Sequence, residues 1–418
     1  MSEIIINGGK RLSGRVSVQG AKNSVLPVLA GTVLCGGESV VHNCPMLSDV
    51  ETSLKILEHL GCKCRREGGA VIVDSSGISE YDIPDSLMRE MRSSVVFLGA
   101  VIGRMGRAVI SSPGGCELGP RPIDLHLSAL ERMGVTITEE HGYLKCTAEN
   151  GLHGAEIHLG FPSVGATENI ILAAAVAAGV TVIHNAAKEP EISDLADFLN
   201  SAGARISGCG SDTVRIEGVK RLGGTEHTII PDRIVAATYM ACAAVTGGEI
   251  ELENVMPPHM VSLLWSFREC GCDISVSGKG LRLSAPGRLR RIPTLRSLVY
   301  PGFPTDAGPV AVAMLASAEG TSVFVENIFE NRYRYIDELN RFGTKIKTEG
   351  KTAVIEGVGE LSGAHAKATD LRGGAALVVA ALKAHGASEI GNTHHIERGY
   401  EKITERLSSL GADISYKR

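Results

Sequence analysis

The chain has 418 residues, a formal net charge of -5, 44% apolar residues and 21% charged residues. This length predicts two or three domains, and the composition is ordinary for a globular protein with a sizeable core. The charge excludes a global basic surface for nucleic acid, and the longest apolar runs are too short to cross a bilayer. The N-terminal MSEIIINGG lacks a signal-peptide pattern, so we expect a soluble, cytoplasmic protein that binds neither nucleic acid nor membrane.

The ten cysteines include two Cys-x-Cys pairs, Cys62 with Cys64 and Cys270 with Cys272. Structural zinc sites usually have two to four residues between paired cysteines, and disulfide frameworks belong to short secreted chains. We therefore expect reduced thiols, no metal and no cofactor.

A helix end, a glycine and the start of a strand recur six times, with successive glycines 73, 69, 68, 72 and 68 residues apart. Glycine suits a helix C-terminus because a positive φ costs it nothing. The helical prediction rests on apolar spacing near 3.6, as in PIDLHLSALERMG. The six glycines are Gly61, Gly134, Gly203, Gly271, Gly343 and Gly411.

A second pattern alternates with the first and consists of an apolar run, a glycine and a strand-like segment. ILAAAVAAGVTVIHN and YMACAAVTGGEIELEN are two of its six copies. Helices that are apolar on all sides are buried, so we expect helices inside and sheets outside. We predict an α/β fold with six repeated units of about 70 residues, three in each of two lobes.

The unit spacing places one passage between the lobes near Thr225 to Arg233, and a second passage is expected near Gly20. We predict a discontinuous C-terminal lobe of residues 1–21 and 231–418 and an N-terminal lobe of residues 22–230. A cleft between two lobes is the usual place for a ligand.

GAKNS, at the start of an apolar helix, is the first segment with chemical character. A helix N-terminus attracts anions through its free N–H groups, and Lys22 adds a positive charge. The alternative is a solvated Lys22 beside Asn23 as a helix cap.

SSPGGCELGPRPIDLH, residues 111–126, is a glycine- and proline-rich loop that contains Cys116. Pro122 suits the first turn of the next helix, which places Arg121 at that helix's N-terminus. Thiolates are favoured near helix N-termini and arginines, so residues 111–122 are a candidate catalytic lid. The alternative is an inert, exposed thiol.

The C-terminal half contributes an acid and several arginines. Asp306 in FPTDAGPV is either a helix cap or a base near a substrate hydroxyl group. Arginines at element junctions suggest a polyanionic ligand; the alternative is internal salt bridges to acids such as Glu330, Asp337 and Asp370. These arginines are Arg332, Arg372 and Arg398.

Nine short motifs run from residue 20 to 401: GAKNS, MRSS, SPGGCELGPRPIDLH, PSVGAT, PDRI, FPTD, FENRY, TDLRGG and HIERGYE. Together they resemble the UDP-N-acetylglucosamine 1-carboxyvinyltransferases, a family of enolpyruvyl transferases, over essentially the whole chain. The resemblance implies a two-lobed inside-out α/β barrel. It also implies transfer of the enolpyruvyl group of phosphoenolpyruvate (PEP) to the 3′-hydroxyl of UDP-N-acetylglucosamine (UDP-GlcNAc), with release of phosphate, as the first committed step of peptidoglycan synthesis.

The resemblance also assigns residue roles. Cys116 would add to PEP and act as general acid, Asp306 would take the hydroxyl proton, and Asn23 would position the tetrahedral intermediate. Lys22, Arg121 and Arg398 would hold the phosphate, Arg332 and Arg372 the carboxylate, and Arg92 would support the closed site. The UDP-GlcNAc site would comprise Arg92, Arg121, Pro122, Ile123, Asp124, Leu125, Ser163, Val164, Gly165, Asp306 and Ile328. The antibiotic fosfomycin would modify Cys116 covalently.

Two positions differ from some family members, which carry lysine in place of Ser48 and Phe161 near the nucleotide sugar. The related enzyme that acts on shikimate 3-phosphate is the main alternative, but the Cys116 loop, RPIDLH and GAKNS argue against it. A catalytically silent nucleotide-sugar-binding protein on the same scaffold is the other.

Overall fold

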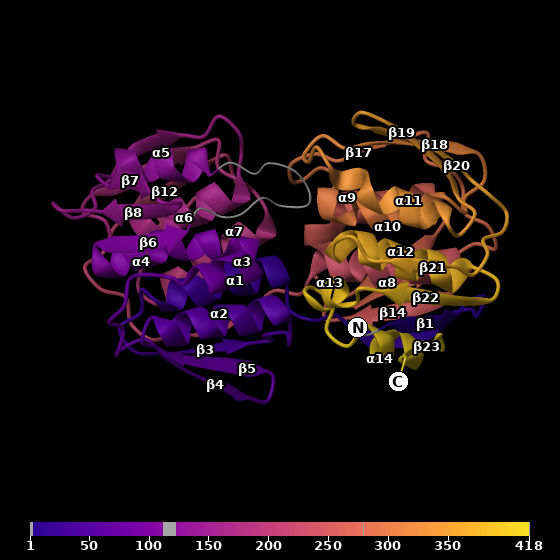
Figure 1. The fold of residues 1–418 in the computed structure, drawn as a ribbon, viewed down its shortest axis with the longest axis horizontal. Coiled ribbons are helices and arrows are strands. Elements are labelled where there is room, and N and C mark those ends of the chain that lie inside the picture. The colour runs from indigo at the N-terminus through magenta and orange to yellow at the C-terminus, as the bar shows by residue number, and fades with distance from the viewer. Residues whose placement is uncertain (1–2, 112–122, 279, 418) are drawn as a thin grey trace. The chain divides into compact units, whose positions relative to one another are not determined.

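The computed structural model describes residues 3–111, 123–278 and 280–417. These residues form two compact units (Figure 1). The C-terminal unit contains the chain up to Gln19 and from Pro231 onward, and the N-terminal unit contains Gly20 to Ile230. No helix in these ranges is long and apolar enough to cross a membrane.

The sheets are small and share one strand order. In the described ranges the N-terminal unit has three sheets, in the orders β13-β3-β5-β4, β9-β10-β12-β11 and β6-β8-β7. Their strands are β13 (Glu226–Thr228), β3 (Glu38–His42), β5 (Ala70–Asp74), β4 (Lys63–Glu67), β9 (Glu156–His158), β10 (Val180–His184), β12 (Thr213–Glu217), β11 (Arg205–Ser207), β6 (Arg107–Ser111), β8 (Tyr143–Thr147) and β7 (Thr136–Glu140).

The C-terminal unit repeats this order in the sheets β2-β14-β16-β15, β17-β18-β20-β19 and β21-β22-β1-β23. In each four-stranded sheet the first pair is parallel and the other pairs are antiparallel. The strands are β2 (Ser13–Ser17), β14 (Glu249–Glu253), β16 (Gly280–Ser284), β15 (Asp273–Ser277), β17 (Thr294–Arg296), β18 (Thr321–Val325), β20 (Thr352–Glu356), β19 (Lys345–Glu349), β21 (His365–Lys367), β22 (Ala387–Gly391), β1 (Ile4–Asn7) and β23 (Asp413–Tyr416).

The three-stranded sheet retains a trace of the missing parallel strand. Asp82 forms a single parallel bridge with Val109 of β6, and two backbone hydrogen bonds flank it. The repeat that contains this sheet therefore has the same topology as the other five, with one strand reduced to a single bridge.

One helix of each repeat is buried inside its unit, as its apolar sequence predicts. Every residue of α8 is buried, and α12 is buried from Arg372 to Leu382. Burying one large aliphatic side chain contributes roughly 1.5–3 kcal/mol, so these helices supply much of each core. The inner helices are α1 (Lys22–Thr32), α4 (Phe97–Met105), α6 (Val164–Ala174), α8 (Arg233–Val245), α10 (Gly308–Leu315) and α12 (Leu371–Lys383).

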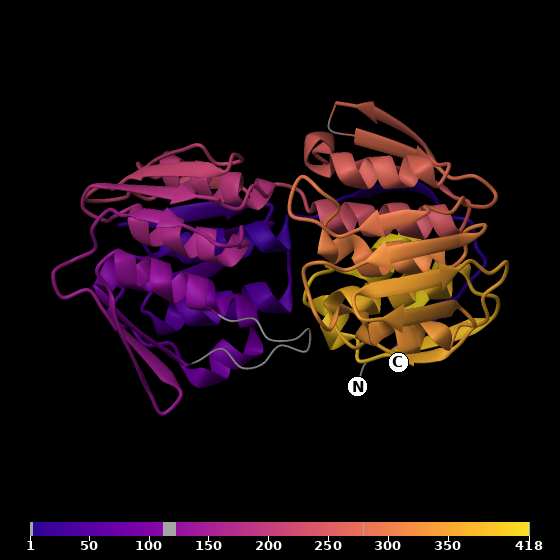
Figure 2. The same ribbon diagram turned by 90° about the horizontal axis from the view of Figure 1, so that it is seen from above.

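The second helix of each repeat ends at the predicted glycine. All six of these glycines have φ between +85° and +109°, a region that favours residues without a Cβ. The outer helices are α2 (Ser48–His59), α5 (Asp124–Arg132), α7 (Pro190–Ser201), α9 (Val261–Glu269), α11 (Ile336–Asn340) and α14 (Ile403–Ser409). Strands lie towards the outside of each unit (Figure 2), so the prediction of inner helices and outer sheets is confirmed.

The N-terminal residues complete sheets of the C-terminal unit. Strand β1 lies between β22 and β23, and β2 pairs in parallel with β14; β1 appears in indigo beside yellow β22 in Figure 1. In the N-terminal unit the corresponding parallel strand is β13, the last strand before the chain leaves that unit, and it pairs with β3. The two units meet between Gln19 and Gly20 and between Ile230 and Pro231. The sequence predicted these boundaries after residues 21 and 230.

An asparagine after a central strand fastens each of five strand-to-helix junctions. Its Nδ2 donates to the carbonyl oxygen just after the parallel neighbour strand, at the point where the chain turns towards an inner helix. The pairs are Asn43 with Ile229, Asn185 with Leu159, Asn254 with Val18, Asn327 with Ser297 and Asn392 with Ala368. This side chain explains the final N of motifs such as VIHN and ELEN.

Candidate active site

The C-terminal unit brings together one carboxylate and two guanidinium groups. Arg332 Nη2 donates to Asp306 Oδ1 at 2.8 Å and to the carbonyl oxygen of Thr305 at 3.1 Å. Arg372 donates to Asp306 Oδ2 from Nη2 at 3.2 Å and from Nε at 3.3 Å. The arginine side chains are 2% and 3% exposed, whereas that of Asp306 is 26% exposed. We call Asp306, Arg332 and Arg372 the acid–arginine cluster.

Local sequence explains how α12 presents Arg372. Asp370 caps the helix, because its Oδ1 accepts from the backbone N–H groups of Arg372 and Gly373, both at 3.0 Å. A Cβ on Gly373 would lie 2.8 Å from Cβ of Tyr335, and a Cβ on Gly374 would lie 2.6 Å from Cγ1 of Ile396. The TDLRGG motif thus combines a cap with a closely packed first turn.

Tyr400 supports the buried charge of Arg372. Arg372 Nη1 donates to the Tyr400 hydroxyl at 3.3 Å, and this hydroxyl lies 2.9 Å from Thr238 Oγ1. Burial is the largest single effect and disfavours the charged guanidinium, but Asp306, Tyr400 and Asp232 together outweigh it, so the pKa of Arg372 is raised. Burial also raises the pKa of Tyr400. Arg372 therefore stays cationic and Tyr400 neutral.

Glu326 organises the segment that follows β18. This buried carboxylate accepts from the hydroxyl groups of Ser297 and Thr305, both at 2.8 Å, and from the backbone N–H of Ile328 at 2.8 Å. It therefore positions Ile328 and the residue that precedes Asp306. The Nε of Arg332 is buried, and no hydrogen-bond partner for it lies among the described residues.

The structure tests two sequence alternatives for these residues. Asp306 lies in the 3-10 helix η3 (Thr305–Ala307), whose N-cap residue is Pro304, and the N-cap residue of α10 is Ala307, so the prediction that Asp306 is a helix cap is wrong. Arg332 and Arg372 do form internal ion pairs, as the other alternative held, but their partner is Asp306 rather than Glu330, Asp337 or Asp370. Arg398 is half-buried and follows α13 (His394–Glu397).

In the N-terminal unit, Lys22 is buried at the start of α1. It is 8% exposed, and its Nζ lies 2.8 Å from Oδ2 of Asp49, which is itself buried in α2. Helix α1 begins at Lys22 with Ala21 as N-cap residue, so the predictions of a solvated Lys22 and a capping Asn23 are wrong. Asn23 is exposed in the first turn.

The segments expected to bind UDP-GlcNAc lie at two helix starts. Ser163 caps α6, since its Oγ accepts from the N–H of Ala166 at 3.3 Å, and Val164 and Gly165 form the first turn. Helix α5 begins at Asp124, two residues after its predicted start. Asp124 is exposed, and Ile123 and Leu125 are half-buried. Ser48 and Phe161, the two positions where some family members carry lysine, are also exposed.

Four predicted site residues lie wholly or partly outside the described structure. Cys116, Arg121 and Pro122 fall between residues 111 and 123. Arg92 begins the 3-10 helix η1 (Arg92–Val96), which follows α3 (Asp85–Glu90), and only its backbone is described.

Several residues that support the site were not predicted from the sequence. Asp49, Tyr400 and Glu326 lie near predicted site residues along the chain, yet no local pattern identifies them as partners. Asp194 is a further example: it accepts from the Ser24 hydroxyl beside Asn23, and its Oδ1 lies 2.9 Å from Nε2 of His227.

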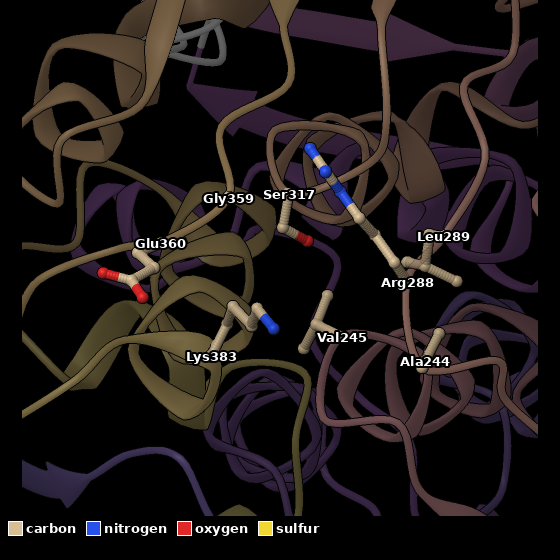
Figure 3. A pocket seen from close by; sticks show the side chains of 9 residues that line it. Ala244, Val245, Arg288, Leu289, Ser317, Gly359, Glu360 and Lys383 are labelled. Carbon is tan, nitrogen blue, oxygen red and sulfur yellow. The ribbon is translucent and has the colours of Figure 1, made fainter.

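One pocket of the C-terminal unit is remote from the acid–arginine cluster. It has a volume of about 240 Å³ and lies at the C-terminal ends of α8, α10 and α12 (Figure 3), whereas Arg372 and Asp306 lie at helix N-termini. Ser317 and Lys383 point towards its centre, and Glu360 points away (Figure 3). The Ser317 hydroxyl already donates to a backbone carbonyl at 3.0 Å.

The nine described cysteines are free thiols, as predicted for them. Burial raises the pKa values of Cys62, Cys64, Cys270 and Cys272 to about 12. Within the described ranges, no group of three or more His, Cys, Asp or Glu side chains could hold a metal ion.

Comparison with known proteins assigns the family. The EPSP synthase (3-phosphoshikimate 1-carboxyvinyltransferase) family profile matches residues 6–407, so the chain belongs to this family. It is 52% identical over 99% of both chains to UDP-N-acetylglucosamine 1-carboxyvinyltransferase 2 of Caldanaerobacter subterraneus subsp. tengcongensis. It is 47% identical to UDP-N-acetylglucosamine 1-carboxyvinyltransferase 1 of Symbiobacterium thermophilum, over 98% of this chain and 94% of that one.

Solved structures agree on the fold. The enolpyruvyl transferase NikO from Streptomyces tendae superposes with a TM-score of 0.89 at 24% identity, covering 100% of this chain and 99% of that chain. EPSP synthase from Acinetobacter baumannii gives a TM-score of 0.77 at 21% identity, with full coverage of both chains. The predicted two-lobed inside-out α/β fold is confirmed.

Proposed function

We propose that this protein transfers the enolpyruvyl group of PEP to the 3′-hydroxyl of UDP-GlcNAc and releases phosphate, the first committed step of peptidoglycan synthesis. The observation that carries the proposal is the 52% identity, over 99% of both chains, to a relative named for this activity. The free thiols suit a reducing compartment, so we place the reaction in the cytoplasm.

The acid–arginine cluster suits a substrate carboxylate. Two buried guanidinium groups present bidentate donors, the geometry that carboxylates prefer. In the ligand-free chain they contact the partly exposed Asp306. A PEP carboxylate would compete with Asp306 for these donors, and Asp306, no longer paired with both arginines, would accept the proton of the attacking hydroxyl group.

The remaining roles follow family resemblance. Lys22, Arg121 and Arg398 are assigned to the phosphate, Arg92 to support of the closed site, and Asn23 to the tetrahedral intermediate. Cys116 is assigned as the acid that protonates the methylene carbon of PEP while the hydroxyl oxygen bonds to the adjacent carbon. Loss of phosphate and of a proton from the methyl carbon then restores the double bond.

The nucleotide-sugar residues are assigned in the same way. Asp124 and Leu125 at the start of α5, Ser163 to Gly165 at the start of α6, and Ile328 after β18 would contact UDP-GlcNAc. Helix N-termini offer free backbone N–H groups for a diphosphate, which would lessen the need for lysines at Ser48 and Phe161.

A phosphate-release assay tests the function. We expect phosphate only when PEP and UDP-GlcNAc are both present. Release with shikimate 3-phosphate in place of UDP-GlcNAc would identify the related synthase instead. Binding of UDP-GlcNAc without any phosphate release would identify a silent binding protein.

A further inference from the structure

One buried amide in the N-terminal unit joins three segments that carry proposed binding residues. Asn169, in α6, has no exposed surface. Its Oδ1 accepts from the backbone N–H of Gly99 at 2.6 Å, and its Nδ2 donates to the carbonyl oxygen of Val95 at 3.1 Å. The same Nδ2 lies 2.8 Å from Nδ1 of His126. Asn169 therefore connects η1, α4 and α5 to α6.

Three of these four segments, η1, α5 and α6, begin with a residue assigned to the substrate. Val95 belongs to η1, which begins at Arg92, and His126 lies in α5, which begins at Asp124. Asn169 itself lies little more than one turn after the start of α6. The proposed substrate contacts thus lie at the starts of η1, α5 and α6, and the Asn169 side chain sets the distances between these segments.

Close packing around Asn169 leaves little room for another arrangement. A Cβ on Gly99 would lie 2.3 Å from the backbone oxygen of Asn169, so only glycine allows α4 to approach α6 here. A Cβ on Gly165 would lie 3.1 Å from Cε1 of His126, a tight contact. Two helices and the His126 ring therefore meet at this amide.

Hydrogen-bond chemistry fixes the orientation of the amide and the state of the ring. The backbone N–H of Gly99 can only donate and the carbonyl of Val95 can only accept, so the Asn169 oxygen faces Gly99 and the nitrogen faces Val95. Because that nitrogen only donates, Nδ1 of His126 has to accept. His126 is therefore the tautomer that carries its proton on Nε2.

We propose, building on the function proposed above, that Asn169 is a positioning residue for nucleotide-sugar binding. It holds the starts of η1, α5 and α6 at fixed separations and keeps His126 in the Nε2–H tautomer. Asn169 contacts no substrate, and its effect reaches the ligand through the segments that it joins.

The test uses Asn169→Asp in the full-length protein. Aspartate retains an acceptor for Gly99 but cannot donate to Val95 or to His126. We expect the Kd for UDP-GlcNAc, measured by titration calorimetry, to rise roughly tenfold. The KM for PEP and kcat at saturating UDP-GlcNAc should change by less than about threefold. A histidine-ring 15N spectrum should show protonation of His126 Nδ1 in this variant.

Asn200→Asp is the matched control. Asn200 also clamps backbone through its amide, donating to the carbonyl of Ile206 at 3.0 Å and accepting from its N–H at 2.8 Å, but α7 carries no residue assigned to the nucleotide sugar. We expect this variant to lose stability while its Kd for UDP-GlcNAc stays unchanged. An equal loss of affinity in both variants, or an unchanged Kd in Asn169→Asp, would overturn the proposal.

The wild-type ring spectrum decides the matter if Asn169→Asp does not fold. The His126 ring signals are assigned as those missing from the spectrum of His126→Gln. An unprotonated Nδ1 on His126 supports the proposal, and a protonated Nδ1 overturns it. Wild-type turnover is measured first: if the wild type releases no phosphate, the proposed function fails. Normal wild-type kinetics with an unaffected Asn169→Asp variant defeats only this inference.

Discussion

Replacing Asp306 with asparagine tests the acid–arginine cluster most directly. The substitution removes the carboxylate between two guanidinium groups that are 2% and 3% exposed. Leaving a buried charge uncompensated costs about 3–5 kcal/mol. Because Asp306 is itself 26% exposed, we expect a loss of stability at the lower end of this range, about 3 kcal/mol. At roughly 2–4 °C per kcal/mol for a unit of this size, the Tm should fall by about 6–12 °C.

Ligand binding should distinguish a competing carboxylate from a simple loss of packing. PEP would supply a carboxylate where Asp306→Asn lacks one, so PEP should raise the Tm of the variant more than that of the wild type. Phosphate release should fall by roughly 100-fold or more, because the proposed base is absent. Differential scanning fluorimetry with and without PEP measures the first effect, and a phosphate assay measures the second.

Asp337→Asn is the control, because Asp337 is an exposed acid in the same unit and outside the cluster. Its Tm should stay within about 2 °C of the wild type. A wild-type Tm in Asp306→Asn, or equal stabilisation of both proteins by PEP, would refute competition between PEP and Asp306 for the two arginines.

Further predictions concern the N-terminal unit. Asp49→Asn should lower the free energy of unfolding by about 3 kcal/mol, since it removes the carboxylate that pairs with buried Lys22, and adding Lys22→Met should recover part of that loss in denaturant titrations. Burial raises the pKa of Glu168 well above 4.5, so its carboxyl group contributes stability below that pH that is lost as the pH rises. Glu168→Gln should therefore gain Tm relative to the wild type as the pH rises above 4.5, whereas exposed Glu131→Gln should not. Preincubation with fosfomycin should abolish phosphate release by the wild type and spare Cys116→Asp; unchanged wild-type activity would reject Cys116 as its target.

Short-range patterns in the sequence determine the repeat and the class of each element. A glycine after an amphipathic helix predicts the helix end because positive φ is a local backbone property, and all six such glycines have it. Helices that are apolar all round must be buried, which accounts for α8 and α12. Such patterns need no knowledge of distant neighbours, and the family motifs rest on the same local information.

Only the tertiary structure decided which charges meet. Asp306 contacts Arg372, 66 residues away, rather than the acids nearer to each arginine, and Lys22 meets Asp49 rather than solvent. Asn169 gathers Gly99 and His126 from two other helices. Hydrophobic periodicity specifies which face of an element is buried, but not which element covers it. Partner choice between buried polar groups is set by packing across the whole unit, where an unpaired charge is too costly to tolerate.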